Sequence, residues 1–254
     1  VLSNAFSSEF GWTAGPAVNI VRKSGRNTVR GEGLYLSRPG GSMQAKTFST
    51  QGFCPTTVIT SSSPATLTAI NPVDIPDQLG QVSVTVGAAS VKSKTFLFVS
   101  SDYTRQDRTT FLSSTLPAFV LPPDGNLEWT GHYRQGLFNG RVDHKLTDQQ
   151  TLMVRVNVDT FYDDNPQDAV GGTNAPSVAR KYSRSSWTAQ VNHTDVISPT
   201  LLNEARVAYL HGNPVTLWEA HDLSTAYTRS GTVPFTYGQS RSSDLYGYQT
   251  QLSD

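Results

Sequence analysis

The sequence predicts an all-β, antiparallel fold, and two observations support this prediction. Apolar residues recur at every second position over about eight segments, whereas the spacing of three and four residues that marks amphipathic helices is nearly absent. Clusters of Ser, Thr, Asp, Gly or Pro, which favour turns, separate several of these segments. The predicted strands cover residues 28–38, 81–86, 94–103, 138–146, 151–160, 186–194, 203–210 and 245–252.

The clearest predicted strand is 151–160, because its two faces differ in character. One face carries Leu152, Val154, Val156 and Val158, and the other carries Met153, Arg155, Asn157 and Asp159. Residues 138–146 alternate in the same way, and only residues 147–150 separate the two segments. This spacing predicts an antiparallel hairpin with one apolar and one polar face.

The lengths of the connections indicate which antiparallel architecture is present. Connections at 87–93, 147–150 and 196–200 are short, and those at 39–80, 104–137, 163–181 and 211–243 are long, so the two kinds alternate. This alternation is typical of outer-membrane β-barrels, which have short periplasmic turns and long extracellular loops. The sequence therefore predicts an antiparallel outer-membrane β-barrel, in part: about eight strands of a larger barrel.

Two other architectures fit the alternation of apolar and polar residues. A secreted β-sandwich that binds glycans or serves adhesion would also show half-buried strands and long polar loops. A self-contained small outer-membrane barrel with a structural or adhesive role would show the same loop pattern.

A polar set on the predicted inner face favours the membrane barrel, because a hydrated lumen accepts charges that a packed sandwich core excludes. The lumen-facing candidates are Arg141, Asp143, Arg155, Asp159, Glu204 and Arg206.

Composition excludes several classes of protein. No segment reaches the roughly 18 apolar residues that a membrane-spanning helix needs. Twenty basic residues balance twenty acidic ones, so charge gives no indication of a nucleic-acid partner. The chain begins at Val1 without a signal peptide, and we expect it to be a fragment of a longer protein.

The opening residues carry a resemblance to a known family. They resemble the plug-to-barrel junction of TonB-dependent outer-membrane receptors of the Oar-like branch, where the pattern is Asn-x-x-x-Ala-Glu-Phe-Gly-x-x-x-Gly-x-x-Val-Asn-x-x-Thr-Lys-Ser-Gly-Thr-Asn. The matching junction residues are Asn4, Glu9, Phe10, Gly11, Gly15, Val18, Asn19, Lys23, Ser24, Gly25 and Asn27. Pro16, Arg22 and Arg26 depart from the pattern.

Later segments resemble the same branch in the same order. These are QAKTFS at 44–49, KTFLFVSSDY at 94–103, FNGRVDHKLTDQQTL at 138–152 and SPTLLNEARVAYLH at 198–211, whereas GAASVKSK at 87–94 departs from it. The resemblance implies that residues 1–25 end the plug domain and that residues 26–254 begin a barrel of about 22 strands. It also implies import of a large or scarce nutrient of siderophore, carbohydrate or peptide type, driven by the TonB complex through an N-terminal part outside this sequence.

No pattern of catalytic residues is present. The sequence lacks nucleophile-elbow, phosphate-loop and zinc-protease motifs, and its five His residues show no metal-ligand spacing. We therefore expect no enzymatic activity, no cofactor and no metal. Asp163, Asp164, Asn165 and Asp168 are expected to lie in a solvated loop.

Aromatic residues suggest two further roles. Trp129 and Trp218 are predicted to lie in long loops, where exposed rings could contact a nutrient ligand. Others fall near predicted strand ends, where interfacial girdles lie in membrane barrels. The girdle candidates are Tyr35, Tyr103, Phe161, Tyr162, Tyr182, Trp187 and Tyr209.

Overall fold

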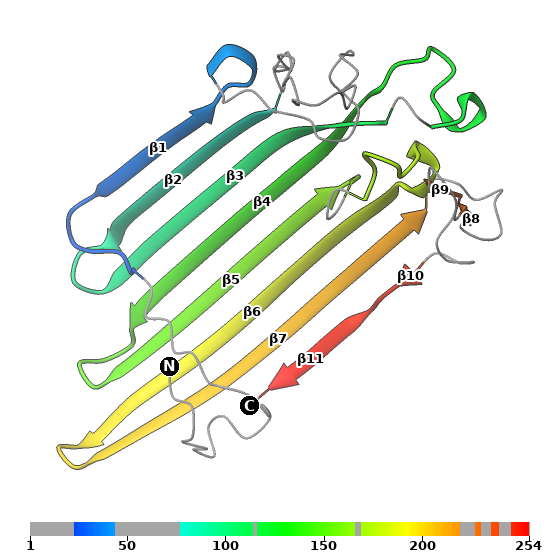
Figure 1. Cartoon of the computed structure of the whole chain (residues 1–254). Helices are drawn as coiled ribbons and strands as arrows, with labels where there is room; N and C mark the ends of the chain where they lie inside the picture. The colour runs from blue at the N-terminus through cyan, green and yellow to red at the C-terminus, as the bar shows by residue number, and fades with distance from the viewer. Residues whose placement is uncertain are drawn as a thin grey trace, which may run out of the picture.

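The chain folds into one large antiparallel sheet (Figure 1). The structure is a computed structural model, and it describes residues 23–43, 77–113, 116–165, 169–218, 227–229, 235–238 and 245–253. The strands are β1 (Arg30–Arg38), β2 (Gln78–Val91), β3 (Thr95–Phe111), β4 (Glu128–Lys145), β5 (Gln150–Asp163), β6 (Arg180–Ser198), β7 (Leu201–Trp218), β8 (Tyr227–Arg229), β9 (Phe235–Tyr237), β10 (Leu245–Tyr246) and β11 (Gln249–Ser253). Three single-turn 3₁₀ helices, η2 (Gly41–Met43), η3 (Ala118–Val120) and η5 (Pro176–Val178), lie in the connections.

Each strand from β1 to β6 pairs with the next in the sequence, and β10 and β11 pair with the free edge of β7. β8 and β9 form a separate two-stranded hairpin. Among the described strands the large sheet does not close, because β1 pairs with β2 alone. Each of the eight predicted strands overlaps an observed strand, which confirms the predicted all-β antiparallel fold.

The last predicted strand, 245–252, is interrupted. β10 and β11 both pair with β7 but are separated at 247–248, opposite Pro214. Gly247 donates a backbone hydrogen bond of 2.7 Å to the carbonyl of Pro214, and a Cβ on Gly247 would lie only 2.7 Å from Cγ of Pro214. Proline has no N–H for the ladder, so the pairing is irregular at this point.

Several strands extend further than the sequence predicted. β3 and β4 have 17 and 18 residues, so much of the predicted connection 104–137 is strand, and only residues 112–127 join the two. About ten residues are enough to cross a bilayer as a tilted strand. On β3 the additional residues 104–110 are polar on both faces, and for this reason they show no alternation of apolar and polar residues.

The three short turns lie at one end of the sheet and the long connections at the other (Figure 1). The turns occupy residues 92–94, 146–149 and 199–200. In the second turn, the hydroxyl of Thr147 accepts hydrogen bonds from the backbone N–H groups of Gln149 and Gln150, at 3.2 and 3.0 Å. The predicted turn at 87–93 is shorter than expected, because β2 continues to Val91 through an irregularity after Ala89.

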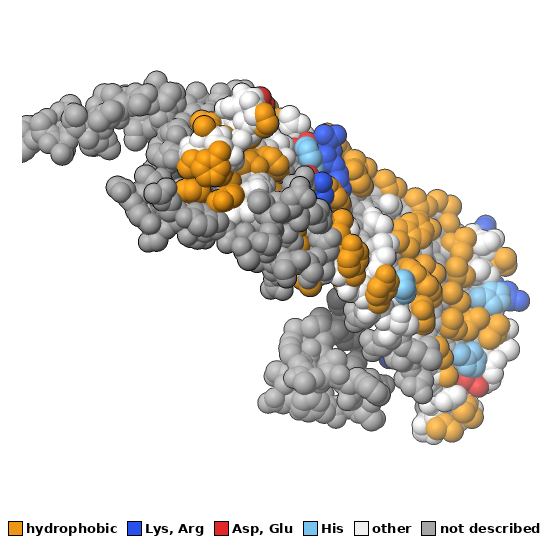
Figure 2. Space-filling view, turned by 90° about the vertical axis from the view of Figure 1, so that its right-hand side faces the viewer, with side chains coloured by type: hydrophobic (Ala, Val, Ile, Leu, Met, Phe, Trp, Pro, Cys, Tyr) orange, Lys and Arg blue, Asp and Glu red, His pale blue; other side chains and the backbone are white. Residues whose placement is uncertain are grey.

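Strand register gives the sheet two different faces. One, here called the apolar face, contains rows of paired apolar residues that cross six strands, and its side chains are exposed (Figure 2). Two neighbouring rows are Ala88, Leu97, Val142, Val154, Val191 and Val207, and Val86, Val99, Gly140, Val156, Ala189 and Tyr209. Val99 is 43% exposed and Val156 37%. An apolar area of this extent requires an apolar medium to cover it.

Most of the buried apolar residues lie outside the body of the sheet. They form a cluster among the long connections, here called the loop cap: Leu112, Leu116, Val170, Val178, Ala179 and Phe235. Backbone hydrogen bonds join its parts, from Ser113 N–H to Gly172 O at 2.7 Å and from Ala175 N–H to Thr236 O at 2.9 Å. The long connections therefore pack against one another at one end of the sheet.

Candidate functional site

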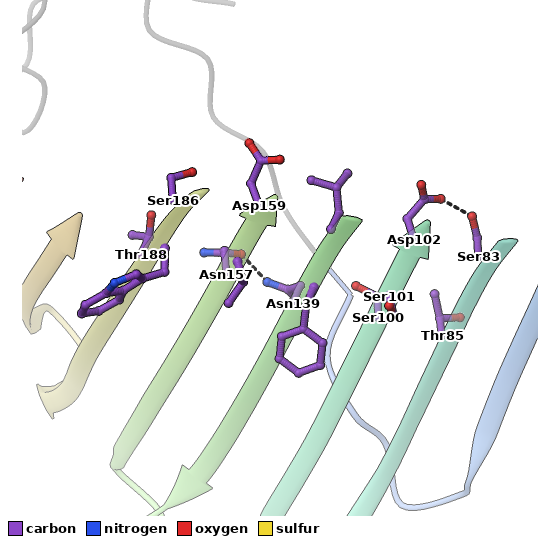
Figure 3. A pocket seen from close by; sticks show the side chains of 14 residues that line it. Ser83, Thr85, Ser100, Ser101, Asp102, Asn139, Asn157, Asp159, Ser186 and Thr188 are labelled. Carbon is purple, nitrogen blue, oxygen red and sulfur yellow. Dashed lines mark hydrogen bonds between the residues drawn. The ribbon is translucent and has the colours of Figure 1, made fainter. Parts of the chain in front are cut away.

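The face opposite the apolar face is polar and contains a shallow hollow across β2 to β6 (Figure 3). Its volume is about 390 Å³. Short uncharged side chains and two carboxylates supply its polar groups: Ser83, Thr85, Ser100, Asp102, Asn139, Asn157, Asp159, Ser186 and Thr188. The strand register places the two carboxylates two strands apart, since Asp102 pairs with Leu137 and Leu137 pairs with Asp159.

Hydrogen bonds hold the polar groups of this hollow in place. The carboxylate of Asp102 accepts hydrogen bonds from Ser83 Oγ, from Gln81 Nε2 at 2.9 Å and from Thr104 Oγ1 at 3.3 Å. The amide of Asn139 donates to the side-chain oxygen of Asn157 on the next strand. The hollow thus presents a fixed array of hydroxyl, amide and carboxylate groups, which suits hydrogen bonding to a polar surface or ligand.

The six lumen-facing candidates all lie on this polar face. Arg141 pairs across the strands with Arg155, and the Arg141 guanidinium binds the Asp143 carboxylate at 2.8 Å. Arg206 binds Glu204 at 2.8 Å, and Asn192 donates to the same carboxylate at 2.7 Å. Asp159 forms an ion pair with Arg184. Five of the six therefore form ion pairs with nearby residues of the same face.

The described residues of the junction motif, Lys23, Ser24, Gly25 and Asn27, lie at the short-turn end of the sheet. Gly25 is buried, and a Cβ there would lie 2.4 Å from the carbonyl oxygen of Leu97 and 2.6 Å from that of Ala88. Asn27 exchanges two hydrogen bonds with Ser93 in the β2–β3 turn, at 2.7 and 3.1 Å. The segment is thus fixed on the β2–β3 hairpin. Asn4, Glu9, Phe10, Gly11, Gly15, Val18 and Asn19 lie outside the described residues.

Trp129 and Trp218 are not the exposed loop residues that the sequence predicted. Trp218 is the last residue of β7 and only 4% exposed, with the Arg180 guanidinium 5.7 Å from the centre of its ring. Trp129 is the second residue of β4 and packs, partly buried, against the loop cap. The expectation failed because the strands extend into segments that were assigned to loops.

Among the described residues, no three His, Cys, Asp or Glu side chains are grouped so that they could hold a metal ion. No helix in that part of the chain is long and apolar enough to cross a membrane.

A comparison with protein families identifies the class of protein that has these two faces. Residues 126–250 match a family model described as an outer membrane beta barrel domain. The chain is an outer-membrane β-barrel protein. Neither the curated proteins nor the solved structures include a significant match to it.

In this outer-membrane barrel the apolar face contacts lipid and the polar face lines the lumen. The long connections and the loop cap are extracellular, and the short turns are periplasmic. The chain forms part of a barrel wall, as predicted, because its large sheet is one open layer of consecutive antiparallel strands; within the described residues the other sheet is the short β8–β9 hairpin.

The aromatic girdle is only partly as predicted. Tyr103, Trp187 and Tyr209 share the lipid face, where the rings of Trp187 and Tyr209 lie 5.0 Å apart. Phe161 and Tyr182 instead face the lumen, where their ring centres lie 5.5 Å apart. The prediction used nearness to a strand end and did not separate odd from even positions, and it therefore mixed the two faces.

Two groups of polar residues were missed by the sequence analysis. The short Ser and Thr side chains of the hollow are common in any loop, so composition alone does not distinguish them. Arg105, Asp107, His132 and Arg134 were missed because residues 104–137 were assigned to a connection. The only available signal was that each strand carries two polar, titratable residues two positions apart.

Proposed function

We propose that the barrel is part of a TonB-dependent receptor that imports a large or scarce nutrient, of siderophore, carbohydrate or peptide type. The observation that carries the proposal is the position of Gly25. A Cβ on Gly87, which shares the lumen side of the sheet with Thr85 and Ser83, would lie 3.5 Å from Cα of Gly25. The chain therefore approaches β1 across the inner side of the wall, at the periplasmic end.

This approach is what a plug inside the lumen requires. A chain that leaves a plug must cross the inner face of the wall and turn into the first strand, and a pair of glycines allows such a close backbone contact. The resemblance of residues 4–27 to a plug-to-barrel junction leads to the same proposal. The polar lumen face, with its hydroxyl, amide and carboxylate groups, offers suitable contacts for a hydrated plug or for a polar nutrient.

The proposed partners follow from this assignment. The TonB complex would act on an N-terminal part outside this sequence, outer-membrane lipid surrounds the apolar face, and the nutrient would be bound by extracellular loops and plug. We propose transport without chemical conversion of the nutrient, and without a cofactor. Trp129 and Trp218 could contact a nutrient only if the loop cap opened.

The first test is the sequence of the gene on both sides of this segment. The proposal predicts a plug domain before Val1 and more than a dozen further amphipathic strands after Asp254, because a plugged transporter barrel has about 22 strands. A signal peptide directly before Val1 and a stop codon directly after Asp254 would instead leave a self-contained small barrel and exclude the receptor.

A second test addresses energy coupling. Full-length protein in detergent should retain the purified periplasmic domain of TonB on an affinity resin, and a variant that lacks the plug should not. Equal retention by both proteins would contradict a coupling route through the plug.

A further inference from the structure

Four titratable residues form a cluster on the lipid side of β3 and β4, just beyond the apolar band and toward the extracellular end. Arg105 pairs across the strands with Arg134, and Asp107 pairs with His132. All four share the face of Tyr103, and along β3 that face changes from Leu97, Val99, Ser101 and Tyr103 to Arg105 and Asp107. The cluster therefore lies where the apolar surface ends and water or lipid headgroups begin.

The cluster is organised around one carboxylate. Asp107 accepts contacts of 2.9 Å from the Arg105 guanidinium, the Arg134 guanidinium and Nδ1 of His132. The Asp107 side chain is 13% exposed, whereas that of Arg105 is 59% exposed and that of His132 is 47% exposed. The negative charge is thus covered, and the cationic groups form the outer surface.

Arg134 is also held by the backbone, and this fixes the geometry of the cluster. Its guanidinium donates to the carbonyls of Gln106 and Tyr133, at 3.1 and 2.8 Å. A second carboxylate, that of Asp164, accepts a hydrogen bond from the backbone N–H of His132. Around Asp107, two guanidinium groups face one carboxylate, and the Arg105 side chain, which is 59% exposed, leaves a cationic group accessible beside the membrane.

We propose that this cluster binds the phosphate-bearing headgroup of a lipid of the outer leaflet. Arginine presents several N–H donors in a planar fork that fits phosphate oxygens, and two such groups on adjacent strands can contact one phosphate together. The apolar residues below, with Tyr103 nearest, would contact the acyl chains of the same lipid. The site rests on the membrane barrel alone and does not depend on the proposed nutrient or on TonB.

The test uses full-length protein in nanodiscs of phosphatidylcholine that contain a minor fraction of bisphosphorylated lipid A. The nanodiscs are dissolved briefly in detergent, and the protein is captured on an affinity resin. Mass spectrometry then measures the ratio of lipid A to phosphatidylcholine among the lipids that remain bound to the protein. We expect enrichment of lipid A with the unaltered protein. The enrichment of lipid A should fall about fivefold in Arg105→Gln. It should fall about a further fivefold in the double variant Arg105→Gln/Arg134→Gln.

Arg141→Gln is the matched control, because Arg141 also binds an aspartate two residues away but faces the lumen. Its enrichment should equal that of the unaltered protein. Asp107→Asn should raise the enrichment, since it removes the carboxylate that competes with phosphate for the two guanidinium groups. Lipid A without phosphate groups should show no enrichment.

Three results would overturn the proposal: enrichment that survives in the double variant, an equal loss in Arg141→Gln, or enrichment of the lipid without phosphate. Arg105→Gln alone is informative if the double variant does not fold, because the Arg105 side chain is the most exposed of the cluster.

Discussion

At the scale of single residues, glycines determine where the chain can approach itself. Gly25 lies against the carbonyls of Leu97 and Ala88. On β4, a Cβ at Gly131 would lie 2.7 Å from Cβ of Asn165, in the region where Arg108 reaches Asp163 on β5 at 2.7 Å. That ion pair joins strands on either side of β4 because the residue between them has no side chain.

The first residue to test is Gly25. In Gly25→Ala the new methyl group overlaps two backbone carbonyls, which cannot move as a flexible side chain can. We expect a loss of about 1–3 kcal/mol in the free energy of unfolding, as for other overpacked sites. Urea-induced unfolding of the full-length protein in lipid vesicles, followed by tryptophan fluorescence, measures it.

Gly33→Ala on β1 is the control, because nothing lies within 4 Å of a Cβ at that position. Its stability should be unchanged or slightly raised, since glycine is unfavourable inside a strand. Equal losses in the two variants would show that Gly25 has no special packing role.

At the scale of elements, the alternation of residues was sufficient for the strands that cross the membrane and insufficient elsewhere. Residues 138–146 and 151–160 could be predicted because one face contacts lipid and the other a hydrated lumen. Residues 104–111 could not, because beyond the bilayer both faces meet water and no alternation is needed. The charged candidates share one face because of their positions within each strand, but their ion pairs depend on register, which a single sequence does not contain.

The same reasoning predicts that a charged substitution is tolerated on the lumen face of the sheet and destabilises the protein on the lipid face. Val156 lies in the middle of the apolar rows, and Val156→Arg places a charge near the centre of the lipid layer. The expected loss in the free energy of unfolding is about 2–4 kcal/mol. Unfolding in vesicles again gives the value, and the amount of folded protein in outer-membrane fractions should fall with it.

Thr188→Arg is the matched change on the lumen face, where Thr188 lines the polar hollow. Because a hydrated lumen tolerates charge, this variant should lose less than about 1 kcal/mol. If the order of the two losses were reversed, the assignment of lipid and lumen faces would be wrong.

At the scale of the whole molecule, the chain contains two parts that are stabilised in different ways. The barrel wall is one layer thick, and among the described residues only Phe98 and Met153 are buried apolar residues within its body. Its stability comes from hydrogen bonds between strands and from lipid on the apolar face. The loop cap instead has a small water-excluding core of its own, made from connections distant in the sequence. Parts that share so few buried contacts are expected to open separately.

Leu112→Ala tests this separation. Leu112 is fully buried in the cap, and truncating a buried leucine costs about 2–5 kcal/mol, which is enough to open a small cluster. We expect a protease added outside intact cells to cleave within 112–127 and 169–179, while the wall keeps its resistance to heat in a detergent gel. Phe119→Ala is the control, since Phe119 is 71% exposed and touches Phe235 and Tyr237 only edge-on. Its cleavage should match that of the unaltered protein. If Leu112→Ala also removed the heat resistance of the wall, the cap and the wall would form one cooperative unit, and movement of the loops on binding a nutrient would have to disturb the barrel itself.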